Sequence, residues 1–184
     1  MRALVVYESM YGNTHTVAEA IAAGLDDSPE VDDVRVLAVA HAGAADVDAA
    51  DLLVVGGPTH AHSMSRESTR TQAIKDADRP DRTLHLDPEA EPGEGVRDWL
   101  AGLDRVDGAP AAAFDTRIDI AALLSGRASK AIARALRHHG FAEAAAPESF
   151  LVTTDNVLVE GEEERARAWG RALATHEQLA TERR

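Results

Sequence analysis

At 184 residues, the chain has the length of a single domain, and its hydrophobic content of 45% is enough to build a sizeable core. The complete lack of cysteine excludes a disulfide framework, a thiolate nucleophile and cysteine-based zinc or iron–sulfur sites. The formal net charge of −13 disfavours nucleic acid and anionic membranes as partners. It is compatible with a basic partner protein, or it serves only to keep the protein soluble.

The sequence shows no targeting or membrane-spanning segment. It has no run of about 18 apolar residues, and its N-terminus lacks the apolar stretch and small-residue cleavage site of a signal peptide. We therefore expect a single cytoplasmic domain over residues 1–184.

The first 25 residues combine a strand, a turn and a helix. Residues 3–7 form an apolar run bounded by turn residues, which predicts a strand buried on both faces. A turn over residues 8–13 follows, and Val17, Ile21 and Leu25 then recur at a spacing of four, which predicts one stripe of a helix. A helix N-terminus presents unpaired N–H groups and a partial positive charge, so this stretch indicates a phosphate site that needs no Lys or Arg.

The remaining elements alternate between strands and helices. Four further strands are predicted at 34–39, 52–55, 110–114 and 150–152, the third strand of the chain being ended by a Gly-Gly-Pro turn at 56–58. Helical segments are predicted shortly before residue 52, near residue 65, from residue 96 to 103, from about residue 128 to 139, and from 161 to about 179. Residues 71–95 are rich in charge and proline, which indicates an exposed polar excursion.

This alternation predicts an α/β fold with a three-layer, doubly wound parallel sheet of five strands, because parallel strands need crossover connections. In such sheets, ligands bind outside the carboxyl ends of the strands, where the strand order reverses. Three loops leave such ends: residues 8–14, residues 56–65, and the chain from Asp115 onward.

The first of these loops carries a specific motif. Ser9-Met10-Tyr11-Gly12-Asn13-Thr14 resembles the phosphate loop of flavodoxins, which is a hydroxyl residue, any residue, a second hydroxyl residue and then Gly-Asn-Thr. The resemblance implies the sheet order 2-1-3-4-5, noncovalently bound FMN, and one- or two-electron transfer through the flavin. It also implies that residues 9–14 hold the ribityl phosphate.

The other two loops are placed by the same resemblance, which extends over nearly the whole chain. It implies that Pro58, Thr59, His60 and Ala61 border the edge of the isoalloxazine ring, although the residues alone also fit a Gly-Pro turn with exposed histidines. The third loop is implied at 115–117, that is, Asp115, Thr116 and Arg117. The Trp or Tyr that many flavodoxins stack on the ring is missing from these loops.

Several other polar residues invite a functional interpretation. His60 and His62 have a spacing that metals sometimes use, but no clear third ligand accompanies them, and we assign no metal site. His138 and His139 suit the dipole at the end of a helix. Arg117 fits a contact to the flavin, to a substrate or NAD(P)H phosphate, or to an acidic neighbour. The motifs of serine hydrolases, zincins and P-loop nucleotide triphosphatases are absent.

From the resemblance, we expect an FMN-binding electron-transfer protein that docks on a redox partner, and the acidity of the chain is compatible with a basic docking surface on that partner. A second hypothesis is an NAD(P)H-dependent quinone or small-molecule reductase that uses FMN, since the missing aromatic lid favours an open flavin face. A third is a flavin-free binding or regulatory module on the same fold.

Overall fold

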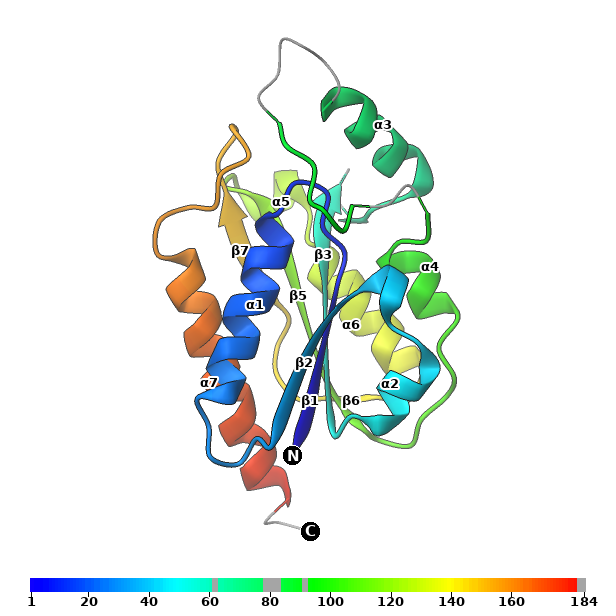
Figure 1. The fold of residues 1–184 in the computed structure, drawn as a ribbon, viewed down its shortest axis with the longest axis vertical. Coiled ribbons are helices and arrows are strands. Elements are labelled where there is room, and N and C mark those ends of the chain that lie inside the picture. The colour runs from blue at the N-terminus through cyan, green and yellow to red at the C-terminus, as the bar shows by residue number, and fades with distance from the viewer. Residues whose placement is uncertain (61–62, 78–83, 91–92, 182–184) are drawn as a thin grey trace.

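The computed structural model describes residues 1–60, 63–77, 84–90 and 93–181. Its centre is a parallel sheet in which β2 (Asp33–Ala38), β1 (Arg2–Tyr7), β3 (Leu52–His60), β5 (Pro110–Ile118) and β7 (Glu148–Val152) lie side by side in that order (Figure 1). In chain order, these are the five predicted strands, and their arrangement confirms the order 2-1-3-4-5. Two short strands were not predicted: β4 (Ser63–Met64), antiparallel to β3, and β6 (Ala142–Glu143), parallel to β5.

Helices cover both faces of this sheet. On one face lie α1 (Asn13–Asp26) and α7 (Glu162–Thr181), and on the other lie α2 (Ala44–Ala49), α4 (Val96–Ala101) and α6 (Ala128–His138) (Figure 1). The short η1 (Val39–His41) precedes α2, and α5 (Ala122–Ser125) follows β5. The helix α3 (Glu67–Ala77) lies beyond the carboxyl ends of the strands.

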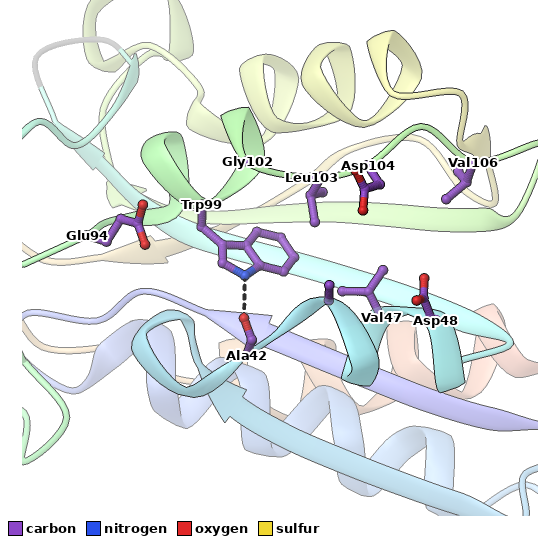
Figure 2. Close-up of a pocket in the computed structure, with 10 residues that line it drawn as sticks. Ala42, Val47, Asp48, Glu94, Trp99, Gly102, Leu103, Asp104 and Val106 are labelled. Carbon is purple, nitrogen blue, oxygen red and sulfur yellow. Dashed lines mark hydrogen bonds between the residues drawn. The ribbon is translucent and has the colours of Figure 1, made fainter.

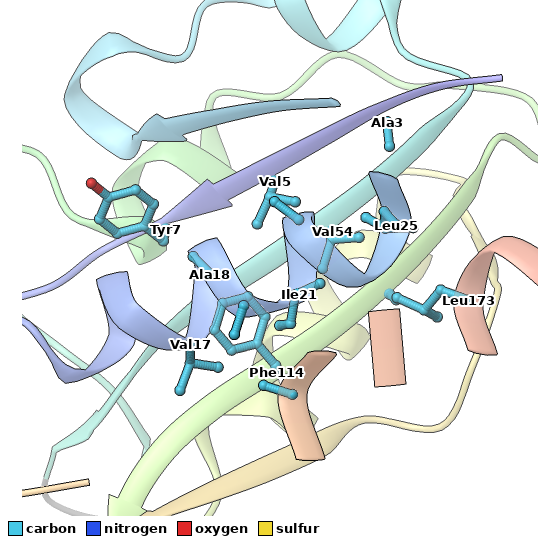
Figure 3. Packing of buried hydrophobic residues seen from close by; sticks show 14 of the residues in the cluster. Ala3, Val5, Tyr7, Val17, Ala18, Ile21, Leu25, Val54, Phe114 and Leu173 are labelled. Atoms are coloured by element: carbon cyan, nitrogen blue, oxygen red, sulfur yellow. The ribbon is translucent and has the colours of Figure 1, made fainter. Parts of the chain in front are cut away.

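The apolar run of β1 is explained by these two layers. Val5 belongs to the cluster packed under α1 and α7, and Val6 belongs to the cluster packed under α2, α4 and α6. Figure 3 shows the first cluster, in which the stripe of Val17, Ile21 and Leu25 on α1 faces the sheet. Because side chains alternate across a strand, a strand covered on both faces must be apolar at every position.

The two helices α1 and α7 approach each other backbone to backbone. A Cβ atom added at Gly24 of α1 would lie 2.0 Å from the carbonyl oxygen of Arg167, and one added at Gly170 of α7 would lie 2.2 Å from that of Ile21. Glycine is therefore required on both helices. At the end of α1, Asp27 forms ion pairs with Arg167 and Arg171, which hold the pKa of its carboxyl well below its usual range.

Two predicted strand ends were wrong. The third strand continues through the Gly-Gly-Pro stretch to His60, and β5 continues through Asp115, Thr116 and Arg117 to Ile118. The reason is pairing with the neighbouring strand: Gly57 aligns with Asp115 and Pro58 with Thr116. Glycine and proline disfavour strands locally, but these partners supply the ladder that the local sequence does not reveal.

Candidate functional site

The carboxyl ends of β1, β3 and β5 bring the three predicted loops together. The backbone N–H of Glu8 donates to the carbonyl of Gly56 at 3.0 Å, which ties the first loop to β3. The hydroxyl groups of Thr14 and Thr116 are 2.7 Å apart and buried, which ties the first helix to β5. The described site residues therefore lie together at the carboxyl end of the sheet, here called the carboxyl edge.

The first loop has the shape of an anion cradle. Gly12 has a φ of 91°, a left-handed conformation that favours glycine, and the space where a Cβ would lie is open to 4 Å. The amide of Thr16 is bonded to the carbonyl of Gly12, so the amides of residues 13–15 precede the first helical bond and have no acceptor within α1. The buried Ser9 accepts from the amide of Gly12 at 3.1 Å, which leaves its own O–H free to donate.

Two side chains of this loop are directed to other parts of the chain. The Tyr11 hydroxyl donates to the carbonyl of Ala73 in α3 at 3.1 Å, and the Asn13 amide donates to the carbonyl of Asn156 at 3.0 Å. The loop is thereby held by its neighbours on two sides. Its capacity for an anion lies chiefly in the backbone amides and in the hydroxyls of Ser9 and Thr14.

The second predicted loop lies on the end of β3. Thr59 donates its hydroxyl to Asp115 at 3.1 Å and accepts from the amide of Ala128, so it joins two strands to α6. His60 carries a buried Nε2 with no hydrogen-bond partner in the described part of the chain. Burial lowers the pKa of this imidazole, against the opposing charge of Glu8, and therefore favours its neutral form. Pro58 is half-buried, and Ala61 and His62 lie outside the described residues.

The third group of predicted residues lies within β5 and not in a loop. Asp115 is fully buried, and its Oδ2 accepts from the amide of Ser129 at 2.7 Å, which caps α6. Arg117 donates to the carbonyls of Ile118 and Ile120 and to Ser125 Oγ, so it shapes the chain after β5. An acidic neighbour for Arg117 is not among these contacts.

Two buried charged residues of this edge were missed by sequence reasoning. Glu8 Oε2 accepts from the amide of Val96 at 2.8 Å, while its Oε1 has no partner among the described residues. Arg70 is 1% exposed and donates to Ser65, to the carbonyl of Gly93 and to Asp98. The position of Glu8 at the end of a predicted strand could have marked it as a site residue. Arg70 lies in a stretch of polar residues, and nothing in the sequence marks it.

Large exposed apolar side chains gather near the same edge. Within the described ranges, those that stand out are Ile118, Ile120, Leu124 and Val157. Ile118 pairs with Val152 at the end of β7, and Val157 lies in the turn that immediately follows this strand. This turn also contains Asn156, the partner of Asn13 in the first loop. The apolar group therefore borders the candidate site.

A separate hollow of about 180 Å³ lies between α2 and α4, away from the strand ends. Figure 2 shows the indole of Trp99 inside it, with Val47 and Leu103 on opposite walls. The indole N–H donates to the carbonyl of Ala42 at 2.7 Å. This contact ties α4 to the chain before α2.

The described residues contain no group of three or more His, Asp or Glu placed to hold a metal ion. Among the helices described, none has the length and apolar character needed to span a bilayer.

The fold is that of a doubly wound α/β protein, and the first loop lies where the strand order reverses. The flavodoxin family model matches residues 5–84, which include the first loop and β3. No curated protein matches the sequence.

Solved structures extend the likeness over nearly the whole chain. A flavodoxin from the domain Archaea has a TM-score of 0.63 and 22% identity, over 95% of this chain and 97% of its own. Oxidised flavodoxin 1 of Bacillus cereus has a TM-score of 0.65 and 16% identity, over 96% and 99%. Rubredoxin oxygen:oxidoreductase of Desulfovibrio gigas has a TM-score of 0.55 and 19% identity, over 96% of this chain but 37% of its own.

The chain is thus flavodoxin-like, as its motif predicted: it has the family's sequence pattern over residues 5–84 and the fold over nearly its whole length. The family implies FMN as the cofactor. The residues present fit that group. Gly12 leaves open space at the start of α1, and His60 offers a buried nitrogen that has no partner among the described residues, where the second loop leaves β3.

Proposed function

We propose that this chain is an FMN-binding electron carrier that exchanges electrons with a partner protein. The observation that carries this proposal is the first loop, which combines open space beside Gly12, first-turn amides of α1 that have no acceptor within the helix, and the hydroxyl of Ser9. FMN would supply the one- or two-electron chemistry when bound, and the protein would supply binding and electrostatics.

The residues divide the binding between two ends of the cofactor. The amides of residues 10–14, with the hydroxyls of Ser9 and Thr14, would hold the phosphate through dipoles and without a basic side chain. Residues 58–61 and 115–117 would border the ring. Their described members are held in place by the bonds among Thr59, Asp115 and α6, so this side of the site is built on rigid strands.

The charge of the chain supports a protein partner. Its formal net charge of −13 would steer a basic docking surface toward it, and the exposed group of Ile118, Ile120, Leu124 and Val157 would give that surface apolar contact beside the cofactor. A cytoplasmic location, where reductases and acceptors are at hand, agrees with this role.

A single spectrum tests the cofactor. Purified protein is expected to be yellow, or to quench FMN fluorescence on mixing. A colourless protein that leaves the fluorescence of micromolar FMN unchanged would refute FMN binding and favour a flavin-free binding or regulatory module.

A second candidate is an NAD(P)H-dependent reductase of quinones or other small molecules. The described residues of the second and third loops include no Trp or Tyr that could cover the ring, so the flavin face would be open to such substrates. The carrier predicts that FMN-loaded protein oxidises NAD(P)H with a quinone acceptor only after a flavodoxin reductase is added. Turnover without that reductase would replace the carrier with the enzyme.

A further inference from the structure

Residues 84–90, here called the strap, lie against the first loop. The amide of Asp87 donates to the carbonyl of Met10 at 2.9 Å. In Figure 1, this green segment runs down toward the loop that follows β1. The segment that the sequence predicted as an exposed excursion therefore contains a residue, Asp87, that is only 4% exposed.

The carboxylate of Asp87 joins the strap to α1. Its Oδ1 accepts from the amide of Glu89 at 2.9 Å, which closes a turn within the strap, and its Oδ2 lies 3.2 Å from Nδ1 of His15. His15 belongs to the first turn of α1, and its ring stacks on Tyr7 with a centroid distance of 4.5 Å. Asp87 thus links the strap to the helix end that follows the cradle.

The bond to Met10 also fixes the orientation of a loop peptide. Peptide bonds in the described chain are trans, so the carbonyl of Met10 and the amide N–H of Tyr11 point in opposite directions. With the carbonyl held by the strap, this N–H is directed away from the strap. On the other side of the loop, Ser9 fixes the amide of Gly12. The hydrogen bond from Asp87 therefore orients the peptide between Met10 and Tyr11 in the first loop.

The fit between strap and loop is close. The hollow bordered by Ser9, Met10, Arg70 and Glu89 measures about 10 Å³, room for about one water molecule. The second carboxylate of the strap, Glu89, pairs with His41 and is partly exposed. It provides a neighbouring acidic side chain that does not contact the loop through its carboxylate.

We propose that Asp87 is a positioning residue for the FMN phosphate, acting through the carbonyl of Met10 and the ring of His15. The inference rests on the proposed function and adds to it a part of the chain outside the three loops. If Asp87 positions the loop that holds the phosphate, replacing it should lower the affinity only for a flavin that carries the phosphate. Riboflavin has the same ring and ribityl chain but no phosphate, so its affinity measures the part of the binding that does not involve the phosphate.

The experiment compares the affinities of FMN and riboflavin by fluorescence quenching. Asp87→Ala is expected to weaken FMN binding about tenfold and to leave riboflavin binding within about twofold of the wild type. Asp87→Asn, whose side-chain oxygen still accepts a hydrogen bond, is expected to retain FMN affinity within about threefold. Glu89→Gln is the matched control and should change neither affinity.

Other outcomes decide against the proposal. An equal loss for FMN and riboflavin would assign Asp87 to the general fold, and an unchanged FMN affinity in Asp87→Ala would remove the residue from the site. If Asp87→Ala fails to fold, Asp87→Ser keeps an acceptor for the amide of Glu89 and makes the same comparison. Wild-type protein that binds no flavin would refute the proposed function as well, whereas normal binding by the variants refutes the role of Asp87 alone.

Discussion

Thr14, at the start of α1, and Thr116, near the end of β5, share a hydrogen bond of 2.7 Å between two buried hydroxyl groups that lie 102 positions apart in the sequence. Either hydroxyl can donate, and when Thr116 donates, the O–H of Thr14 is left to donate to another acceptor. It holds the first turn of α1 at a fixed position relative to β5.

Thr14→Val is expected to reduce the free energy of unfolding by about 1–3 kcal/mol, because it leaves the buried hydroxyl of Thr116 without a partner. Thr116→Val should cost a similar amount. The double variant should cost less than the sum, since it removes both polar groups at once. Urea unfolding of the three variants measures the cycle, and strictly additive losses would show that the two hydroxyls do not interact.

Asp115 is predicted to act through α6. Asp115→Ala removes the acceptor used by the amide of Ser129 and the hydroxyl of Thr59, and should lower the free energy of unfolding by about 2 kcal/mol or more. Asp115→Asn keeps an oxygen acceptor and should cost less. Chemical denaturation of both variants checks this order, and an alanine variant as stable as the asparagine variant would contradict the capping role.

The close approach of α1 and α7 predicts a steric effect. Gly24→Ala places a methyl group 2.0 Å from the backbone carbonyl of Arg167, which neither helix can avoid without moving, and should cost about 1–3 kcal/mol. Gly102→Ala is the control, because its nearest neighbour lies at an ordinary 3.5 Å and its φ is −87°. Thermal unfolding should separate the two variants, and equal melting temperatures would disprove the contact.

His60 predicts a dependence of stability on pH. Burial lowers its pKa below the ordinary value of 6.5, so below that pH the unfolded chain binds a proton that the folded chain does not. His60 therefore contributes a loss of stability as the pH falls through about 6.5. The unfolding free energy of the wild type should fall more than that of His60→Asn between about pH 7.5 and pH 5.5. The opposite sign would mean that the charge of Glu8 outweighs burial.

Much of this fold could be predicted from the sequence because it depends on local periodicity. The stripe of Val17, Ile21 and Leu25 and the buried runs of β1 and β3 have one physical reading each: a helix with one apolar face, and strands covered on both sides. The strand ends could not be predicted in the same way. Pro58 and Asp115 lie in strands because a neighbouring strand pairs with them.

In the candidate site, too, some residues can be predicted from a local pattern and others cannot. Its first loop is a contiguous motif that carries its own chemistry, so residues 9–14 were found as a unit, and their role toward FMN remains a prediction. Glu8, Arg70 and Asp87 are single charged residues among many, and they matter only because distant segments bury each of them. Glu8 has a local signal in its position at a strand end, but no local pattern distinguishes Arg70 and Asp87 from an ordinary solvated surface.

By itself, the sequence determined the alternation of buried strands and amphipathic helices and the glycine turn before α1, because these depend on side-chain period and on conformations that few residues adopt. Only the tertiary structure decided that Asp87 lies behind the first loop, that Thr14 meets Thr116, and that Asp115 caps α6. These contacts join residues far apart in the chain, and their energy exists only after the strands have paired and excluded water from between them.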